Sequence, residues 1–176
     1  MSRHLFFIHH AYSIEIVAFV LMKNSFHLLL RTPLNNLSEA MRYFMRETSR
    51  EITSASGRIN QTYVQRHSRT IISTHHYFLH AYKYVYRNPV VSGHCGLAED
   101  YRFSTLNGLI GRSHLLIPVV EDKTLFSDLE GTLEWLNRPS SADSWHSVKV
   151  ALRKSRFSLS RDPRTKGSNR LDFNAL

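Results

Sequence analysis

The chain has 176 residues, 42% of them hydrophobic, and its 23 Lys and Arg residues outnumber 14 Asp and Glu residues for a formal net charge of +9. This length can bury one hydrophobic core with a small appendage. The charge favours a polyanionic partner, nucleic acid ahead of an anionic membrane surface. The only cysteine, Cys95, excludes an internal disulfide, and the longest apolar runs are too short to span a bilayer.

A helix and a β-hairpin are predicted at the start of the chain. Leu5, Ile8 and Tyr12 recur at the spacing of one helix face. Residues 14–22, IEIVAFVLM, are rich in β-branched and aromatic side chains and predict a strand. Residues 26–31 predict the partner strand of a hairpin.

A long helix with a basic face is predicted after Pro33. Asn36 and Glu39 form a capping-box pattern, and apolar residues follow at helical spacing as far as Ile52. Another face carries three arginines, each one turn from the next: Arg42, Arg46 and Arg50. Such a stripe either contacts phosphates or is a solvated face of the helix, which is its more common meaning.

A strand and a second helix are predicted in the middle of the chain. The strand covers residues 62–72, and Ser73 is placed to cap a helix over residues 74–87. Pro89 is predicted to end that helix, because proline lacks the N–H group that a helix interior requires.

The last third of the chain predicts short helices and a basic tail. The helices fall at residues 104–110, 132–136 and 143–153. Residues 149–170 hold eight Lys and Arg residues and one acid, a composition typical of a segment that is disordered alone. The expected organisation is a domain over residues 1–111, a helical extension over 112–154 and a basic, disordered tail over 155–176.

Two groups of side chains can carry chemistry. Ser25 and His27 are expected on one face of a strand, because alternate strand residues share a face. Two histidines at this spacing would form a metal pair, and only one is present.

Tyr84 and Asn88 lie one helical turn apart, and a tyrosine can attack a phosphodiester that a metal polarises. Taken alone, Tyr84 is better explained by aromatic packing.

A second histidine pair, His76 and His80, also lies one turn apart on the predicted helix. This spacing can bind a metal ion. Exposed or capping roles for these two histidines are the simpler interpretation.

The order of these motifs resembles that of the single-tyrosine HUH transposases, and most closely their REP-associated branch. The similarity runs from about residue 14 to residue 111. It rests on four motifs that are weak alone and specific together: Asn24 with Phe26–His27–Leu28–Leu29, Gly57–Arg58, Tyr84-x-x-x-Asn88–Pro89–Val90, and Glu99–Asp100–Tyr101 before Ser104–Thr105–Leu106.

The resemblance implies a fold and a chemistry. The fold is a ferredoxin-like α+β domain, an antiparallel sheet with helices on one face. The family cleaves and rejoins single-stranded DNA through a 5′-phosphotyrosine intermediate with Mg²⁺ or Mn²⁺. Carried over to this chain, Tyr84 is the nucleophile, His27 is the second HUH histidine and Asn88 is the third metal ligand. Ser25 occupies the position of the first HUH histidine.

Three departures from the family pattern stand out. A serine hydroxyl at position 25 is a poor ligand for Mg²⁺ or Mn²⁺, which leaves the metal weakly bound or lost. The family's first strand is expected to be missing, because the chain starts inside what resembles the first helix. Side chains at Val64 and Gln65 stand where the family tends to place glycine.

Three functions remain open from the sequence. The first is a transposase-like enzyme that transesterifies phosphodiesters. The second is a catalytically impaired module that binds single-stranded or hairpin DNA through arginines, namely Arg42, Arg46, Arg50, Arg58, Arg66 and Arg69. The third is a decayed fragment. All three place the protein in the cytoplasm at the nucleoid, away from membranes and with a homodimer as one possible state.

Overall fold

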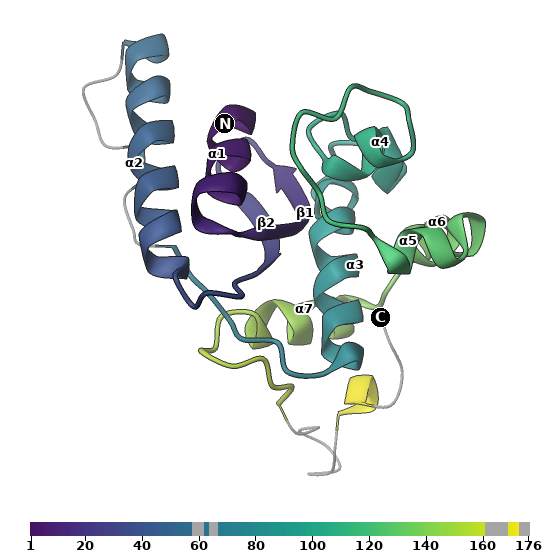
Figure 1. Cartoon of the computed structure of the whole chain (residues 1–176). Helices are drawn as coiled ribbons and strands as arrows, with labels where there is room; N and C mark the ends of the chain where they lie inside the picture. Colours follow the sequence, from purple (N-terminus) through teal and green to yellow (C-terminus); the bar gives the residue numbers. More distant parts are fainter. Residues whose placement is uncertain (58–61, 64–66, 161–168, 173–176) are drawn as a thin grey trace.

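The computed structural model describes all residues except 58–61, 64–66, 161–168 and 173–176. Two strands, β1 (Glu15–Leu21) and β2 (Phe26–Arg31), lie among helices (Figure 1). The α-helices are α1 (Ser2–Tyr12), α2 (Leu37–Ser56), α3 (His75–Val91), α4 (Thr105–Leu109), α5 (Lys123–Ser127), α6 (Leu129–Asn137) and α7 (Ala142–Ala151), with 3₁₀ helices η1 (Ala98–Asp100) and η2 (Arg170–Asp172). The predicted α+β class with an antiparallel sheet is confirmed.

The hairpin sets the faces of the sheet. β1 pairs antiparallel with β2, with Val20 opposite His27 and Leu21 opposite Phe26. The register shifts between Ile16 and Ala18, and a residue inserted at such a bulge changes which side chains share a face. The sheet within the described residues has these two strands, and β1 and β2 match the predicted hairpin closely.

Helices cover both faces of this small sheet (Figure 1). On one face, α1 and α2 contribute Leu5, Ile8 and Phe44 to a core with Ile16 and Phe19 of β1. On the other face, α3 packs on the sheet through a second core, which contains Ala18, Val20, Leu29, Tyr82, Val85 and Tyr86. The sequence predicted helices on one face only, and α3 differs by covering the second face because its buried stripe matches the apolar residues there.

The outer edge of β1 is occupied by loops rather than by a strand. The Leu21 N–H donates to the Phe103 carbonyl at 2.9 Å, and the Val120 N–H donates to the Ile16 carbonyl at 2.9 Å. The Thr105 hydroxyl accepts from the Phe19 N–H at 2.9 Å. These bonds satisfy backbone groups of β1 that an open edge would leave unpaired.

The capping box predicted for α2 is wrong. Asn36 precedes α2, but its side chain makes no cap hydrogen bond. Its amide nitrogen instead donates to the Tyr12 carbonyl at 2.8 Å. The side chain therefore ties the end of α1 to the start of α2, and this tertiary contact replaces the local cap.

The strand predicted over residues 62–72 is also wrong among the described residues of that range. Only Ile71 forms a β-bridge, parallel to Arg156. The Ile71 N–H donates to the Ser155 carbonyl and the Ile71 carbonyl accepts from the Phe157 N–H, at 3.0 and 2.9 Å. Pairing is limited to one residue, so the β-branched composition of this segment does not build a strand. Val64 and Gln65 lie outside the described residues.

Helix α3 starts and ends later than predicted. Thr74, not Ser73, caps it, and its hydroxyl accepts from the Tyr77 N–H. Pro89 lies inside the last turn, where its missing N–H removes only one helical hydrogen bond. The helix ends near Gly93, whose φ of 72° suits a residue without a side chain, and the His94 N–H donates back to the Pro89 carbonyl.

The C-terminal third packs against α3. Helices α6 and α7 match the two helices predicted there. In the described part of the C-terminal segment, Phe157 and Leu171 are buried with Tyr84, Val148 and Ala151 in a third cluster. No helix in the described part of the chain is long and apolar enough to cross a membrane.

Candidate functional site

Two of the predicted site residues that are far apart in the sequence, His27 and Tyr84, meet in space. His27 belongs to β2 and Tyr84 to α3, and the two rings lie edge to face with centroids 5.6 Å apart. The sheet register turns His27 toward α3, on the face that also buries Leu29. Asn88 follows Tyr84 by one turn on the same helix. The structure therefore brings Tyr84 into contact with both His27 and Asn88.

Ser25 lies in the hairpin turn, directly before β2. Its carbonyl accepts from the Met22 N–H at 2.8 Å, and the residue is exposed.

Tyr84 is covered by a residue that the sequence analysis did not select. Its ring stacks on Trp145 of α7, with centroids 4.7 Å apart and ring planes at 23°. Only 7% of Tyr84 is exposed, and Val148, Ala151 and Phe157 complete its surroundings. Trp145 therefore covers a face of the Tyr84 ring, and little of the residue is open to a phosphodiester.

The phenol of Tyr84 is held in its protonated form. Burial raises its pKa above the ordinary value of 10.0, while a hydrogen bond with the Asn88 side chain and the positive charge of Arg153 act in the opposite direction. The net shift is upward, so this tyrosine is a weaker nucleophile at neutral pH than an exposed one.

The imidazole of His27 is held neutral. Burial lowers its pKa below the ordinary value of 6.5, and the positive charge of Lys149 lowers it further. A neutral imidazole has a lone pair that can bind a metal ion. The same Lys149 charge repels a divalent cation, however.

The donors at this site do not fit Mg²⁺ or Mn²⁺ well. They are one imidazole and one amide oxygen, that of Asn88, which also accepts from the Ser92 hydroxyl at 3.4 Å. Both metals prefer oxygen ligands that include carboxylates, and the nearby side chains of Lys149 and Arg153 are cationic. The described residues hold no group of three His, Cys, Asp or Glu side chains placed to bind a metal ion.

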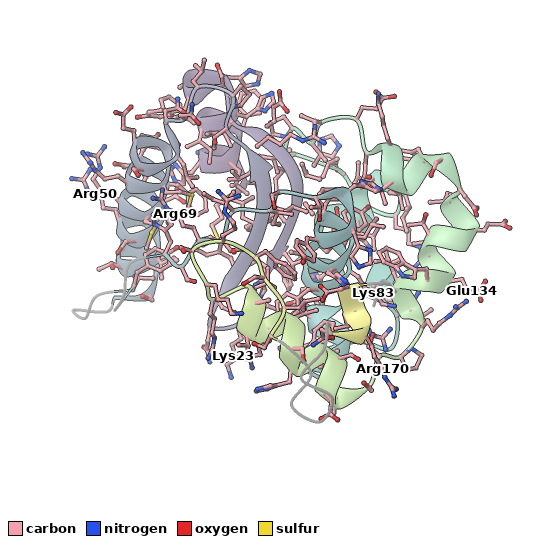
Figure 2. The ribbon with its side chains drawn as sticks, turned by 90° about the horizontal axis from the view of Figure 1, so that it is seen from below. Lys23, Arg50, Arg69, Lys83, Glu134 and Arg170 are labelled. Atoms are coloured by element: carbon pink, nitrogen blue, oxygen red, sulfur yellow. The ribbon has the colours of Figure 1, made fainter. Side chains whose placement is uncertain are left out.

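Two groups of exposed basic side chains bear on the predicted contacts with nucleic acid. On α2, Arg42, Arg46 and Arg50 are all exposed. Glu47 forms ion pairs with Arg46 at 2.7 Å and Arg50 at 3.3 Å, which reduces the charge that these two present. Arg69 is also exposed, and Figure 2 shows it on the same side of the molecule as Arg50. Arg58 and Arg66 lie outside the described residues.

The second basic surface surrounds Tyr84 and was missed from the sequence. Lys149 and Arg153 are exposed and lie close enough to His27 and Tyr84 to shift their pKa values. With Trp145 they recur at every fourth residue through α7 and just beyond it. That spacing was the available signal, because it places an aromatic ring and two cations on one helix face.

Comparison with family models, curated proteins and solved structures found no match to this chain.

Proposed function

We propose that this protein binds single-stranded or hairpin DNA through its basic surfaces and that the Tyr84 site is catalytically impaired. The observation that carries the proposal is the burial of Tyr84 beneath Trp145, beside Lys149 and Arg153 and with a poor donor set for a divalent metal. The arrangement suits binding of phosphates better than their activation.

The charge distribution supports binding of a flexible polyanion. Exposed cations occur on α2, at Arg69 and beside Tyr84, and each phosphate contact releases counterions from the nucleic acid. Trp145 lies one turn before Lys149 on α7, stacks on Tyr84 and is only partly buried. Aromatic rings next to cations are the usual platform for unpaired bases.

Strand cleavage is the second candidate function. It is favoured by the adjacency of Tyr84, His27 and Asn88, whose residue types match the roles that the resemblance implies. For cleavage, Trp145 must leave the Tyr84 ring, and a metal must bind with Ser25 in place of a histidine.

Anisotropy of a labelled hairpin with a single-stranded flank tests the binding proposal. Affinity should fall steeply with salt, and Arg42→Gln should reduce the slope of log affinity against log salt by about one. The matched control is Arg112→Gln, since Arg112 pairs with Asp100 at 2.6 Å beyond α4. Binding that does not depend on salt, or that both variants weaken equally, would contradict the proposal.

A denaturing gel tests the cleavage candidate separately. The same hairpin is incubated with the protein and Mg²⁺ or Mn²⁺, and a covalent adduct is sought. We expect little adduct from the wild type and more from Ser25→His, which adds an imidazole two residues before His27. An abundant wild-type adduct that Tyr84→Phe abolishes would replace the impaired-site proposal with an active transposase.

A further inference from the structure

A line of polar side chains runs along α3 at one-turn intervals. It starts at His76, continues through His80 and reaches Tyr84 and then Asn88. The two histidines contact Leu171 of the short helix η2. This helix lies beside the N-terminal end of α3 in Figure 1. The spacing of this histidine pair is visible in the sequence, and the Leu171 carbonyl is a third partner for it in the structure.

Three polar atoms converge at this point. The Leu171 carbonyl oxygen lies 2.5 Å from His76 Nε2 and 2.9 Å from His80 Nε2, and the two nitrogens are 3.2 Å apart. The rings are nearly perpendicular, at 87°. Both imidazoles thus direct their Nε2 atoms at the Leu171 carbonyl oxygen, and the three atoms border one small volume.

This spacing matches that of metal ligands. Nitrogen atoms bound to a tetrahedral zinc ion at 2.0–2.1 Å are about 3.3 Å apart, close to the 3.2 Å between the two histidine nitrogens. The carbonyl lies nearer to both, so a bound ion requires it to move outward by less than about 1 Å. Two histidines one turn apart on a helix are a common zinc-binding pair.

Charged side chains of both signs lie near the buried histidine. His80 is fully buried, and both the Asp172 carboxylate and the Lys83 ammonium group lie near enough to act on it electrostatically. Asp172 accepts a hydrogen bond from the Tyr77 hydroxyl at 3.1 Å, so a carboxylate is fixed beside the site and can offset the charge of a cation.

We propose that His76, His80 and the Leu171 carbonyl form a binding site for a transition-metal ion of the Zn²⁺ class. Water completes the coordination, and Asp172 supplies outer-sphere negative charge. The ion fastens residues 169–172 to α3 one turn before Tyr84, next to the cluster that contains Phe157 and Leu171. This structural role is separate from DNA binding and does not depend on the proposed function.

The test uses Co²⁺ as a spectroscopic probe of the full chain and Zn²⁺ as its competitor. The wild type should bind one Co²⁺ with visible absorption bands, and Zn²⁺ should displace it. Zn²⁺ at about 100 times its dissociation constant should raise the melting temperature by about 5–10 °C. His76→Gln is the main variant, because His76 is only partly buried and its replacement leaves the core intact.

Two control variants separate this site from other histidines. His75→Gln alters the exposed neighbouring residue on the same helix, and His27→Gln alters the histidine beside Tyr84. We expect His76→Gln to weaken Co²⁺ binding at least about tenfold, with both controls retaining it. The proposal is overturned if the wild type gives no absorption bands, if His76→Gln binds as tightly as His75→Gln, or if only His27→Gln abolishes binding.

Discussion

Two faces of helix α3 treat their tyrosines differently. Tyr82 and Tyr86 face the main core, where both are fully buried and their rings pack against each other at 4.9 Å. Tyr84 lies between these two tyrosines in the sequence. Its side chain faces β2 and α7, where it contacts His27 and Trp145. All three are nearly inaccessible, so burial alone does not distinguish a structural tyrosine from a candidate functional one.

The hydroxyl partners make the distinction. The Tyr82 hydroxyl donates to the buried Asp122 carboxylate at 2.6 Å, and the Tyr86 hydroxyl bonds the Thr105 hydroxyl at 3.1 Å. Both partners also hold backbone groups, since Asp122 caps α5 and Thr105 binds the edge of β1. The Tyr84 hydroxyl instead interacts with the Asn88 side chain. The first two tyrosines are thus parts of the scaffold, whereas the third is not needed to close any element.

The largest expected effect is on Tyr82. Tyr82→Phe should lower the free energy of unfolding by about 2–3 kcal/mol, because it leaves a buried carboxylate without its strongest donor. Urea denaturation followed by circular dichroism measures the change. A loss below about 0.5 kcal/mol would mean that the Asp122 contact is not part of the scaffold, and the contrast between the two faces would disappear.

The next effect concerns the cover on Tyr84. Trp145→Ala should cost about 1–2 kcal/mol, since it removes a partly buried aromatic stack. It should also make Tyr84 reactive toward a tyrosine-nitrating reagent, read by peptide mass spectrometry, while Tyr82 and Tyr86 stay protected. Equal labelling of all three tyrosines would indicate general loosening, and unchanged labelling of Tyr84 would show that Trp145 is not its cover.

Local patterns were sufficient for much of this scaffold. The hairpin and the helices at both ends of the chain followed from alternation, helical spacing and turn residues, because each signal lies within the element it predicts. The capping-box prediction was wrong at Asn36, because its side chain donates a hydrogen bond to the Tyr12 carbonyl and does not cap α2. The strand expected before residue 72 failed because its only described pairing partner, Arg156, is remote in sequence.

The sequence predicted the residues around Tyr84 only in part. Tyr84, His27 and Asn88 were selected through the resemblance, and the structure does bring them together. Their cover was not predictable in the same way, because Trp145 reaches Tyr84 through a tertiary contact between α3 and α7. Periodicity reveals that α7 carries an aromatic and basic face, but not the surface against which that face packs.

A smaller effect on the pH dependence of stability tests the role of His27 beside Tyr84. The pKa of His27 is lowered in the folded state, so the unfolded chain takes up the proton first as pH falls. Stability from the neutral imidazole is therefore complete above about pH 6.5 and lost progressively below it. His27→Gln should flatten the decline in unfolding free energy between about pH 7.5 and pH 5.5. His75→Gln is the control and should leave the decline unchanged.

The smallest expected effect is that of removing the Tyr84 hydroxyl. Tyr84→Phe should change the free energy of unfolding by less than about 1 kcal/mol, because Asn88 keeps a second partner in the Ser92 hydroxyl. The raised pKa of Tyr84 adds a signature, since the unfolded chain ionises first and stability falls as pH rises through about 10. Tyr84→Phe should lessen that alkaline loss, measured by urea denaturation beside Tyr82→Phe at neutral and alkaline pH. If Tyr84→Phe is as costly as Tyr82→Phe at neutral pH, the Tyr84 hydroxyl is a scaffold group like its neighbours and the functional assignment of this face fails.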